Sequence, residues 1–426
     1  MRGKAQEDGM QNGYFRIALA LVAAAAWCGC GGDDRMVTAD AGRDAGPMTG
    51  DGGLDGGPVG DAGAADAGGA DAGGGDPCGA SLLITTSDYV TGGLGVLEIA
   101  TGDAETDDVI DDQDTVPALV GCTPALIERA EGNLRIQSVE ELAGTVRTID
   151  LDPAGTTAPY ATNPVAVVSI DATKAYVIAQ GRNEIVIVDP TMDGTAGVTG
   201  TIDLSGFVHP DDMDGLVDAL SAIRAGDRVY VGLGNYWFDS SFAIQFEGSV
   251  LAVIDAATDT VVDMDGATDG VQGIDLAGEN PWRGMWVSES GDRLWVGAGG
   301  DGFAIDGMIE EIDLGTGTSA GAVVTEETLG AELGGFAVVA SDRVLVLAGR
   351  DVVAFDPGAA FPADPDPIAS EVDGMIPHAG SLWVWSREGA AVGLRRFDAA
   401  DGTDLTPAAG PWTFGALPIY AVSPAP

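Results

Sequence analysis

Short runs of β-branched and other apolar residues, separated by Gly, Asp, Pro and Asn, fill residues 80–426. Few stretches in this region repeat apolar residues at helical spacing. Runs of this kind are typical of β-strands joined by tight turns. The pattern therefore predicts an all-β domain over residues 78–426.

The runs recur as a unit. Residues 163–174 lead into an apolar run at 175–179, a second run follows at 184–189, and a fourth strand is expected at 200–204. Four strands in about forty residues is the size of one β-propeller blade. Similar units begin near residues 228, 281 and 335, and the unit near 228 carries a long insertion between two strands.

The unit that begins Asn163-Pro164 and closes its third strand at Asp189 resembles the YVTN/YncE-like (WD40-like) repeats of bacterial exported β-propellers. The resemblance implies a propeller fold and carries little information about activity. Asp-Gly pairs fit the hairpin turns of such a blade, and the aspartate that ends the third strand fits the start of the next turn.

The repeat predicts seven four-stranded blades. Residues 417–423 look like a first strand without a blade behind it, whereas residues 81–85 begin as a second strand. Pairing the two would close the ring and remove both sheet edges. Six or eight blades and a pair of β-sandwiches are the alternatives. The predicted blades are 81–114, 117–151, 163–204, 216–270, 281–329, 335–372 and 376–411.

Residues 1–29 have the pattern of a signal peptide. Basic residues precede a short apolar run at 17–27, which ends in Trp27-Cys28-Gly29-Cys30. This ending resembles a bacterial lipobox, with Cys30 as the lipid-attachment residue. A buried N-terminal helix is the alternative. The resemblance implies an exported lipoprotein that is held by its N-terminal lipid at the outer membrane or its periplasmic face.

Residues 30–77 form an Asp/Gly/Ala-rich stretch without aromatic residues, which predicts a disordered tether between the lipid and the domain. Two further cysteines, Cys78 and Cys122, are an even pair in an oxidising compartment, and we expect a disulfide between them. Two buried free thiols are the alternative.

The formal net charge of the chain is −48. A field of this sign repels nucleic acid and anionic lipid headgroups, so we expect no nucleic-acid partner. It favours cations, basic partners or plain solubility.

An Asp-x-Asp-Gly-x-x-Asp pattern occurs twice and resembles calcium loops, in which alternating carboxylates converge on the ion. Ordinary turn formation by Asp-Gly is the alternative. The sequence thus names calcium as a candidate cofactor. The candidate ligands are Asp212, Asp214 and Asp218 in the first copy and Asp263, Asp265 and Asp269 in the second.

Several unusual loops are expected on one face of the propeller, around the fourth and fifth blades. They carry carboxylates and aromatic side chains suited to a protein or glycan ligand. Burial of the aromatic residues on their own blade is the alternative. The candidate binding residues are His209, Tyr236, Trp237, Phe238, Asp239, Asp301 and Asp306. The expected exit of the fourth blade, at residues 263–269, belongs to the same group.

Motifs of catalysis are scarce. The chain has two histidines and lacks the G-x-S-x-G, H-E-x-x-H and Walker-type patterns. We therefore expect a non-enzymatic binding or scaffolding module. The alternative is a periplasmic hydrolase or oxidoreductase that uses carboxylates on the propeller rim.

Overall fold

A computed structural model describes residues 81–87, 92–99, 101–110, 114–138, 144–152, 161–238, 244–246, 248–302, 304–389, 391–414 and 417–422. The predicted signal peptide, Cys30, the tether and Cys78 lie outside the described residues. The disulfide between Cys78 and Cys122 therefore stays a prediction.

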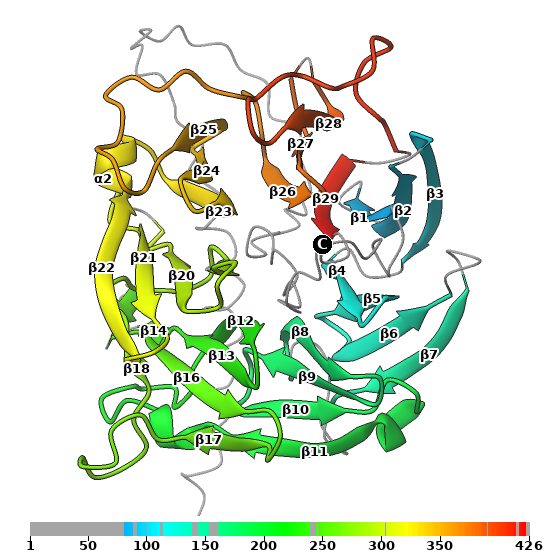
Figure 1. The fold of residues 1–426 in the computed structure, drawn as a ribbon. Helices are drawn as coiled ribbons and strands as arrows, with labels where there is room; N and C mark the ends of the chain where they lie inside the picture. The colour runs from blue at the N-terminus through cyan, green and yellow to red at the C-terminus, as the bar shows by residue number, and fades with distance from the viewer. Residues whose placement is uncertain are drawn as a thin grey trace, which may run out of the picture. The chain divides into compact units, whose positions relative to one another are not determined.

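Within the described residues the chain forms a seven-bladed β-propeller, as the repeat predicts. The blades follow one another around the ring in Figure 1. The first three are β29 (Leu417–Val422), β1 (Ser81–Ser87), β2 (Gly92–Glu98) and β3 (Asp103–Ile110); β4 (Thr115–Val120), β5 (Thr123–Glu128), β6 (Asn133–Gln137) and β7 (Thr145–Asp150); and β8 (Pro164–Asp171), β9 (Lys174–Ala179), β10 (Glu184–Val188) and β11 (Val198–Asp203).

Blade four contains an inserted hairpin and an interrupted outer strand. Its strands are β12 (Ala219–Ala225), β13 (Arg228–Leu233), β16 (Val250–Asp255), β17 (Thr260–Val262) and β18 (Ile274–Asp275), and the hairpin is β14 (Tyr236–Phe238) with β15 (Ile244–Phe246). Blade five is regular: β19 (Met285–Val287), β20 (Arg293–Ala298), β21 (Met308–Asp313) and β22 (Thr318–Thr325).

Blades six and seven have three regular strands each. These are β23 (Leu333–Ala340), β24 (Arg343–Ala348) and β25 (Asp351–Phe355), then β26 (Gly374–His378), β27 (Ser381–Ser386) and β28 (Gly393–Asp398). Isolated bridges, such as Val352 to Ala369 and Leu394 to Trp412, occupy the fourth position. Residues 357–367 and 407–411 contain prolines, which cannot donate to a strand ladder and so favour single bridges there.

The ring closes as predicted. Strand β29 pairs antiparallel with β1, with Leu83 opposite Val422 and Thr85 opposite Tyr420. The C-terminal strand thus supplies the innermost strand of the first blade and leaves no open edge between the first and last blades.

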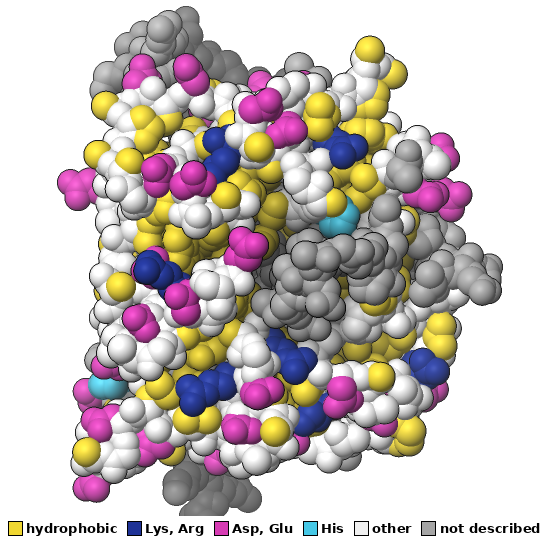
Figure 2. Space-filling view, viewed as in Figure 1, with side chains coloured by type: hydrophobic (Ala, Val, Ile, Leu, Met, Phe, Trp, Pro, Cys, Tyr) yellow, Lys and Arg dark blue, Asp and Glu magenta, His cyan; other side chains and the backbone are white. Residues whose placement is uncertain are grey.

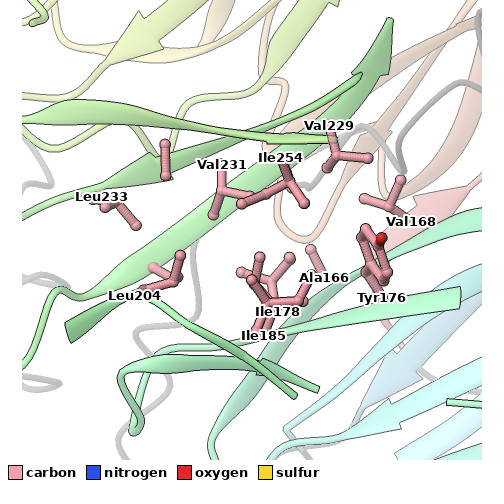
Figure 3. Packing of buried hydrophobic residues seen from close by; sticks show 14 of the residues in the cluster. Ala166, Val168, Tyr176, Ile178, Ile185, Leu204, Val229, Val231, Leu233 and Ile254 are labelled. Carbon is pink, nitrogen blue, oxygen red and sulfur yellow. The ribbon is translucent and has the colours of Figure 1, made fainter. Parts of the chain in front are cut away.

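Successive side chains of an inner strand point to opposite faces of the sheet and pack on the two neighbouring blades. In β9, Tyr176 and Ile178 pack with blade four, whereas Ala175 and Val177 pack with blade two. Figure 3 shows Tyr176 and Ile178 facing side chains from blade four such as Val229. Both faces of the strand are therefore buried, and each fully buried aliphatic side chain contributes about 1.5–3 kcal/mol.

Short elements cap the connections between strands. They are the 3-10 helices η1 (Gly194–Gly197) and η2 (Ser205–Phe207) and the helix α2 (Glu326–Leu329). Among the described residues no helix combines the length and apolar character needed to cross a membrane.

A left-handed residue starts several blades. Asn163, Asp218 and Asn280 have φ of 44°, 47° and 62°, a region that Asn and Asp tolerate better than other side chains. In each case the carbonyl of this residue accepts a bond from the end of the second strand, for example from Gln180 N at 3.0 Å and from Gly234 N at 2.9 Å. This turn explains the Asn-Pro start of the repeat, and in blade four it places Asp218 beside the β13–β16 insertion.

Candidate functional site

The predicted binding loops largely share one rim. Successive strands of a blade are antiparallel, so the connection from second to third strand and the connection to the next blade leave the same end of the sheet. Residues 204–218, the insertion at 234–249 and residues 299–307 are connections of these two kinds. We call this end of blades four and five the rim.

The second aspartate motif does not lie at the exit of blade four, so that part of the prediction is wrong. Strands β17 and β18 both pair with β16, and residues 263–273 leave the outer strand between them and then return to it. Strand β18 resumes the ladder, so the blade ends after residue 275. The excursion nevertheless reaches the start of the 204–218 loop, because a methyl group at Gly206 would lie 3.7 Å from Val271.

The number of acidic side chains alone does not distinguish one part of the surface from another. Acidic side chains are spread over the whole face that Figure 2 shows. Burial and hydrogen bonding are more selective. The carboxyls whose pKa is raised, among the described residues, all lie in rim connections of blades four and five: Asp214, Asp218, Glu279 and Asp306. Perturbed pKa values of this kind concentrate at functional sites.

Asp212, Asp214 and Asp218 form what we call the blade-four cluster. Asp214 N donates to Asp212 Oδ1 at 3.0 Å, and Leu216 N donates to Asp214 Oδ1 at 2.9 Å. Asp218 is buried, and Tyr236 N donates to its Oδ2 at 3.3 Å. The structure thus brings together the three carboxyls of the first predicted motif.

Burial sets the electrostatics of this cluster. It raises the pKa of Asp214 to about 6, partly opposed by the bond from Leu216 N and reinforced by neighbouring Asp212. Burial also raises the pKa of Asp218 well above its ordinary value, and the charge of Asp214 adds to the effect. Within the described part of the chain, no Lys or Arg forms an ion pair with any of the three.

Arg129 of blade two bonds to residues outside the blade-four cluster. Arg129, just after β5, lies 3.3 Å from Asp114 and donates through Nε to Asn163 Oδ1 at 3.1 Å. Asn163 Nδ2 donates to Gln180 Oε1 at 2.8 Å, and Gln180 Nε2 donates to the Tyr236 hydroxyl at 2.7 Å. These bonds link blades two, three and four. The spacing of these residues along the chain carries no signal of the contacts, so the sequence does not predict them.

The aromatic insertion is more buried than predicted. Trp237 is 7% exposed, so for this ring the structure favours the alternative, burial on the blade, over a role in binding. Tyr236 packs edge-to-face on Phe238 at 6.1 Å between ring centroids and lies at the same distance from Phe246. The hairpin β14–β15 thus folds its aromatics on one another, which leaves Tyr236 and Phe238 partly exposed. Asp239 lies outside the described residues.

The rim of blade five carries a second group of carboxyls. Asp301 N donates to Asp306 Oδ1 at 3.2 Å, and Ala304 N donates to Asp301 Oδ1 at 2.6 Å. Burial raises the pKa of Asp306, and it raises the pKa of Glu279 with Asp306 and Asp301 as further causes. The structure therefore brings the two predicted aspartates together. Glu279 was missed, although its place directly before Asn280-Pro281 marks it as a blade-entry residue.

Exposed apolar residues flank both acidic groups. Met213, between the first two aspartates of the blade-four cluster, is 76% exposed, and Ile305, beside Asp306, is 51% exposed. His209 is partly exposed at the start of the same loop, and Asp211 N donates to its Nδ1 at 3.3 Å.

The carboxylates of the second motif form turns. Asp263 Oδ1 accepts bonds from Asp265 N at 3.2 Å and Gln272 N at 3.1 Å, and Asp265 accepts from Ala267 N and the Thr268 hydroxyl. These last two bonds lower the pKa of Asp265. Asp269 contributes its carbonyl to Gln272 Nε2 at 3.3 Å. Within the described residues no group of three or more His, Cys, Asp or Glu side chains is arranged to hold a metal ion, and calcium stays a prediction.

No protein-family model and no curated protein matches the chain. Among solved structures it is similar to a candidate 6-phosphogluconolactonase from Bacteroides fragilis, at 11% identity over 80% of this chain and 96% of that one, with a TM-score of 0.52. It is more loosely similar to BamB from Moraxella catarrhalis, at 14% identity over 73% and 80% of the two chains and a TM-score of 0.45. These neighbours are β-propellers, and the likeness bears on the fold alone.

Proposed function

We propose that this protein is an exported lipoprotein whose propeller binds a partner protein through the rim of blades four and five. One observation carries the proposal: the carboxyls of raised pKa gather on this rim beside the exposed side chains Met213 and Ile305. A partner that covers the rim would bury the apolar side chains and meet the carboxyls with opposite charge. Apolar anchors surrounded by polar groups are the usual composition of protein interfaces.

Site-specific photocrosslinking tests this proposal. A photoreactive amino acid replaces Met213 or Ile305 in cells that produce the full chain, and Val146 on β7 of blade two, at 50% exposure, is the matched control. Discrete crosslinked species from the two rim positions and none from Val146 are the expected result. Equal crosslinking from all three positions, or none from the rim, contradicts the proposed site.

The anchoring part of the proposal rests on the lipobox-like Trp27-Cys28-Gly29-Cys30 ending of the apolar run. Two or three acyl chains on Cys30 would hold the protein stably at a membrane, where one chain would not. Replacing Cys30 with Ser should move the protein from the membrane to the soluble fraction. Retention of the C30S variant in the membrane fraction refutes attachment at this residue.

A hydrolase that uses the rim carboxyls is the second candidate. The observation in its favour is Asp214, because a carboxyl with a pKa of about 6 beside a second carboxyl is suited to general acid catalysis. Screening glycosides, lactones and phosphoesters with the full chain and with Asp214→Asn separates the candidates. Turnover that disappears in the D214N variant would favour the enzyme.

A further inference from the structure

In the described part of the chain, the blade-four cluster has fewer hydrogen-bond donors than carboxyl oxygens, and no Lys or Arg forms an ion pair with it. Asp212 Oδ2 is buried, and no donor reaches it in the described structure. Main-chain N–H groups already occupy the other oxygen of Asp212 and one oxygen of Asp214. A buried acceptor without a donor costs about 1–3 kcal/mol, so such groups are rare unless a ligand or water completes them.

Asn235 gives an independent observation beside the cluster. It is 2% exposed, and its N donates to Val217 O at 3.2 Å while its Nδ2 donates to Gly248 O at 3.3 Å. Among the described residues, no donor reaches its Oδ1. The residues on either side of Asn235 both bond to Asp218: Gly234 N reaches the carbonyl and Tyr236 N reaches Oδ2. A buried side-chain oxygen without a donor therefore lies in the segment that packs on the third carboxyl.

We propose that Asp212, Asp214, Asp218 and Asn235 bind the protonated amine or guanidinium of a basic side chain on the partner protein. The inference rests on the proposed function and specifies the group that the rim recognises. An ammonium brings the missing charge together with three N–H donors, which match the few oxygens left open here. Calcium takes about six to eight oxygen ligands, and among the described residues no group of three or more His, Cys, Asp or Glu side chains is arranged to hold a metal ion.

Met213 favours a protein side chain over a free polyamine. It lies between Asp212 and Asp214 and is 76% exposed, so a residue next to the basic side chain of a partner would cover it. A free polyamine carries no apolar side chain that could cover Met213. We expect apolar residues beside the basic residue of the partner to strengthen binding, and we expect this gain to depend on Met213.

Calorimetric titration of the full chain with a Leu-Lys-Leu-Lys peptide tests the proposal. The Asp212→Asn/Asp214→Asn variant should weaken binding at least about tenfold, because it removes the charge while Asn keeps the Oδ1 acceptor of each turn. The matched control is Asp263→Asn/Asp265→Asn, which makes the same change of charge in the same motif on the same blade. Binding of the control within about twofold of the parent is expected. Equal weakening in both variants, or in neither, overturns the proposal.

Further arms identify the ligand. Met213→Ser should weaken the peptide about threefold to fivefold and leave spermidine unaffected; spermidine that binds as tightly as the peptide overturns the partner assignment. If calcium displaces the peptide and its binding requires Asp212 and Asp214, the cluster is a metal site and the proposed binding of an amine is overturned. Should the double variant melt below the parent, Asp214→Asn alone replaces it. Rim crosslinking that persists while titration shows no dependence on the cluster refutes this inference and leaves the proposed function standing.

Discussion

Two buried carboxyls, one blade apart, are treated in opposite ways. The Glu310 carboxylate on β21 is fully buried and accepts bonds from Ala277 N at 3.0 and 3.1 Å, Gly278 N at 3.3 Å and the Ser319 hydroxyl at 2.7 Å. Asp218 on the rim of blade four is buried with a single N–H at 3.3 Å and two carboxyls as neighbours.

The difference separates a carboxylate that stabilises the fold from one that does not. Glu310 replaces its lost hydration with protein donors and fastens the connection between blades four and five. Asp218 has lost hydration without equivalent replacement, which disfavours its charged form. A group that the fold does not satisfy is a candidate for satisfaction by a ligand, and this contrast is the physical basis of the proposed site.

The largest effect is expected at the satisfied carboxylate. Glu310→Ala removes the acceptor of the Ala277 and Gly278 N–H groups and of the Ser319 hydroxyl, and we expect a loss of about 3 kcal/mol in the free energy of unfolding. Denaturant titration at neutral pH measures it. Glu289→Ala, at an exposed position on the same blade, should change stability by less than about 0.5 kcal/mol. A loss in E310A no larger than in E289A would remove one side of the comparison.

The pH dependence of stability should reveal the raised pKa of Asp214 on the rim. Folding raises the pKa of Asp214 to about 6, so between about pH 4 and pH 6 the native state holds a proton that the unfolded chain has released. The resulting stabilisation is present below about pH 4 and is lost as the pH rises through 6. Between about pH 4 and pH 6 the free energy of unfolding of the parent should therefore fall relative to that of D214N. After allowance for solvent screening we expect this relative fall to be about 1 kcal/mol. Parallel stability curves for the two proteins would contradict it.

Asp218→Asn should be neutral or stabilising, by up to about 1 kcal/mol at pH 8. The amide removes a charge that burial disfavours, and Asn tolerates the left-handed backbone of this position. Melting of D218N beside the control Asp263→Asn checks the sign. Destabilisation of D218N by more than about 2 kcal/mol would show that the carboxylate stabilises the fold as Glu310 does.

The smallest effect is expected from calcium at the second motif. Asp263 and Asp265 already accept N–H and hydroxyl groups of their own turn, so turn formation accounts for this copy of the motif. We expect the melting temperature to change by less than about 1 °C on addition of calcium. A rise that disappears in the Asp263→Asn/Asp265→Asn variant would make this excursion a calcium loop.

Sequence periodicity was sufficient to predict the propeller, because blades repeat and their turns use Asn, Asp and Gly at fixed places. The start of β8 at Pro164 and the closure by β29 both follow from this repetition. The prediction placed residues 263–269 at the exit of blade four. The outer strand of this blade is interrupted and then resumes at β18, and no feature of the sequence marks where it resumes.

The candidate site was predicted in part. The carboxyls of Asp212, Asp214 and Asp218 do come together, because one loop carries them. The burial of Trp237 depends on how the hairpin packs, and the link from Gln180 to Tyr236 joins two blades, so neither has a local sequence signal. The composition predicts acidic side chains over the whole surface and does not favour one part of it. Only the structure distinguishes Glu310, which accepts several hydrogen bonds, from Asp212, which has one buried oxygen without a donor among the described residues.

The blade-four carboxyls are proposed to bind a cationic group, and binding should lower the pKa of Asp214. Carboxyl-selective NMR titration of Asp214 in the full chain tests it most directly, first alone and then with the Leu-Lys-Leu-Lys peptide. We expect a pKa of about 6 in the free protein and a fall towards the ordinary aspartate value when the peptide binds. A pKa near 4 in the free protein, or one that the bound peptide leaves unchanged, would refute cation binding by these carboxyls.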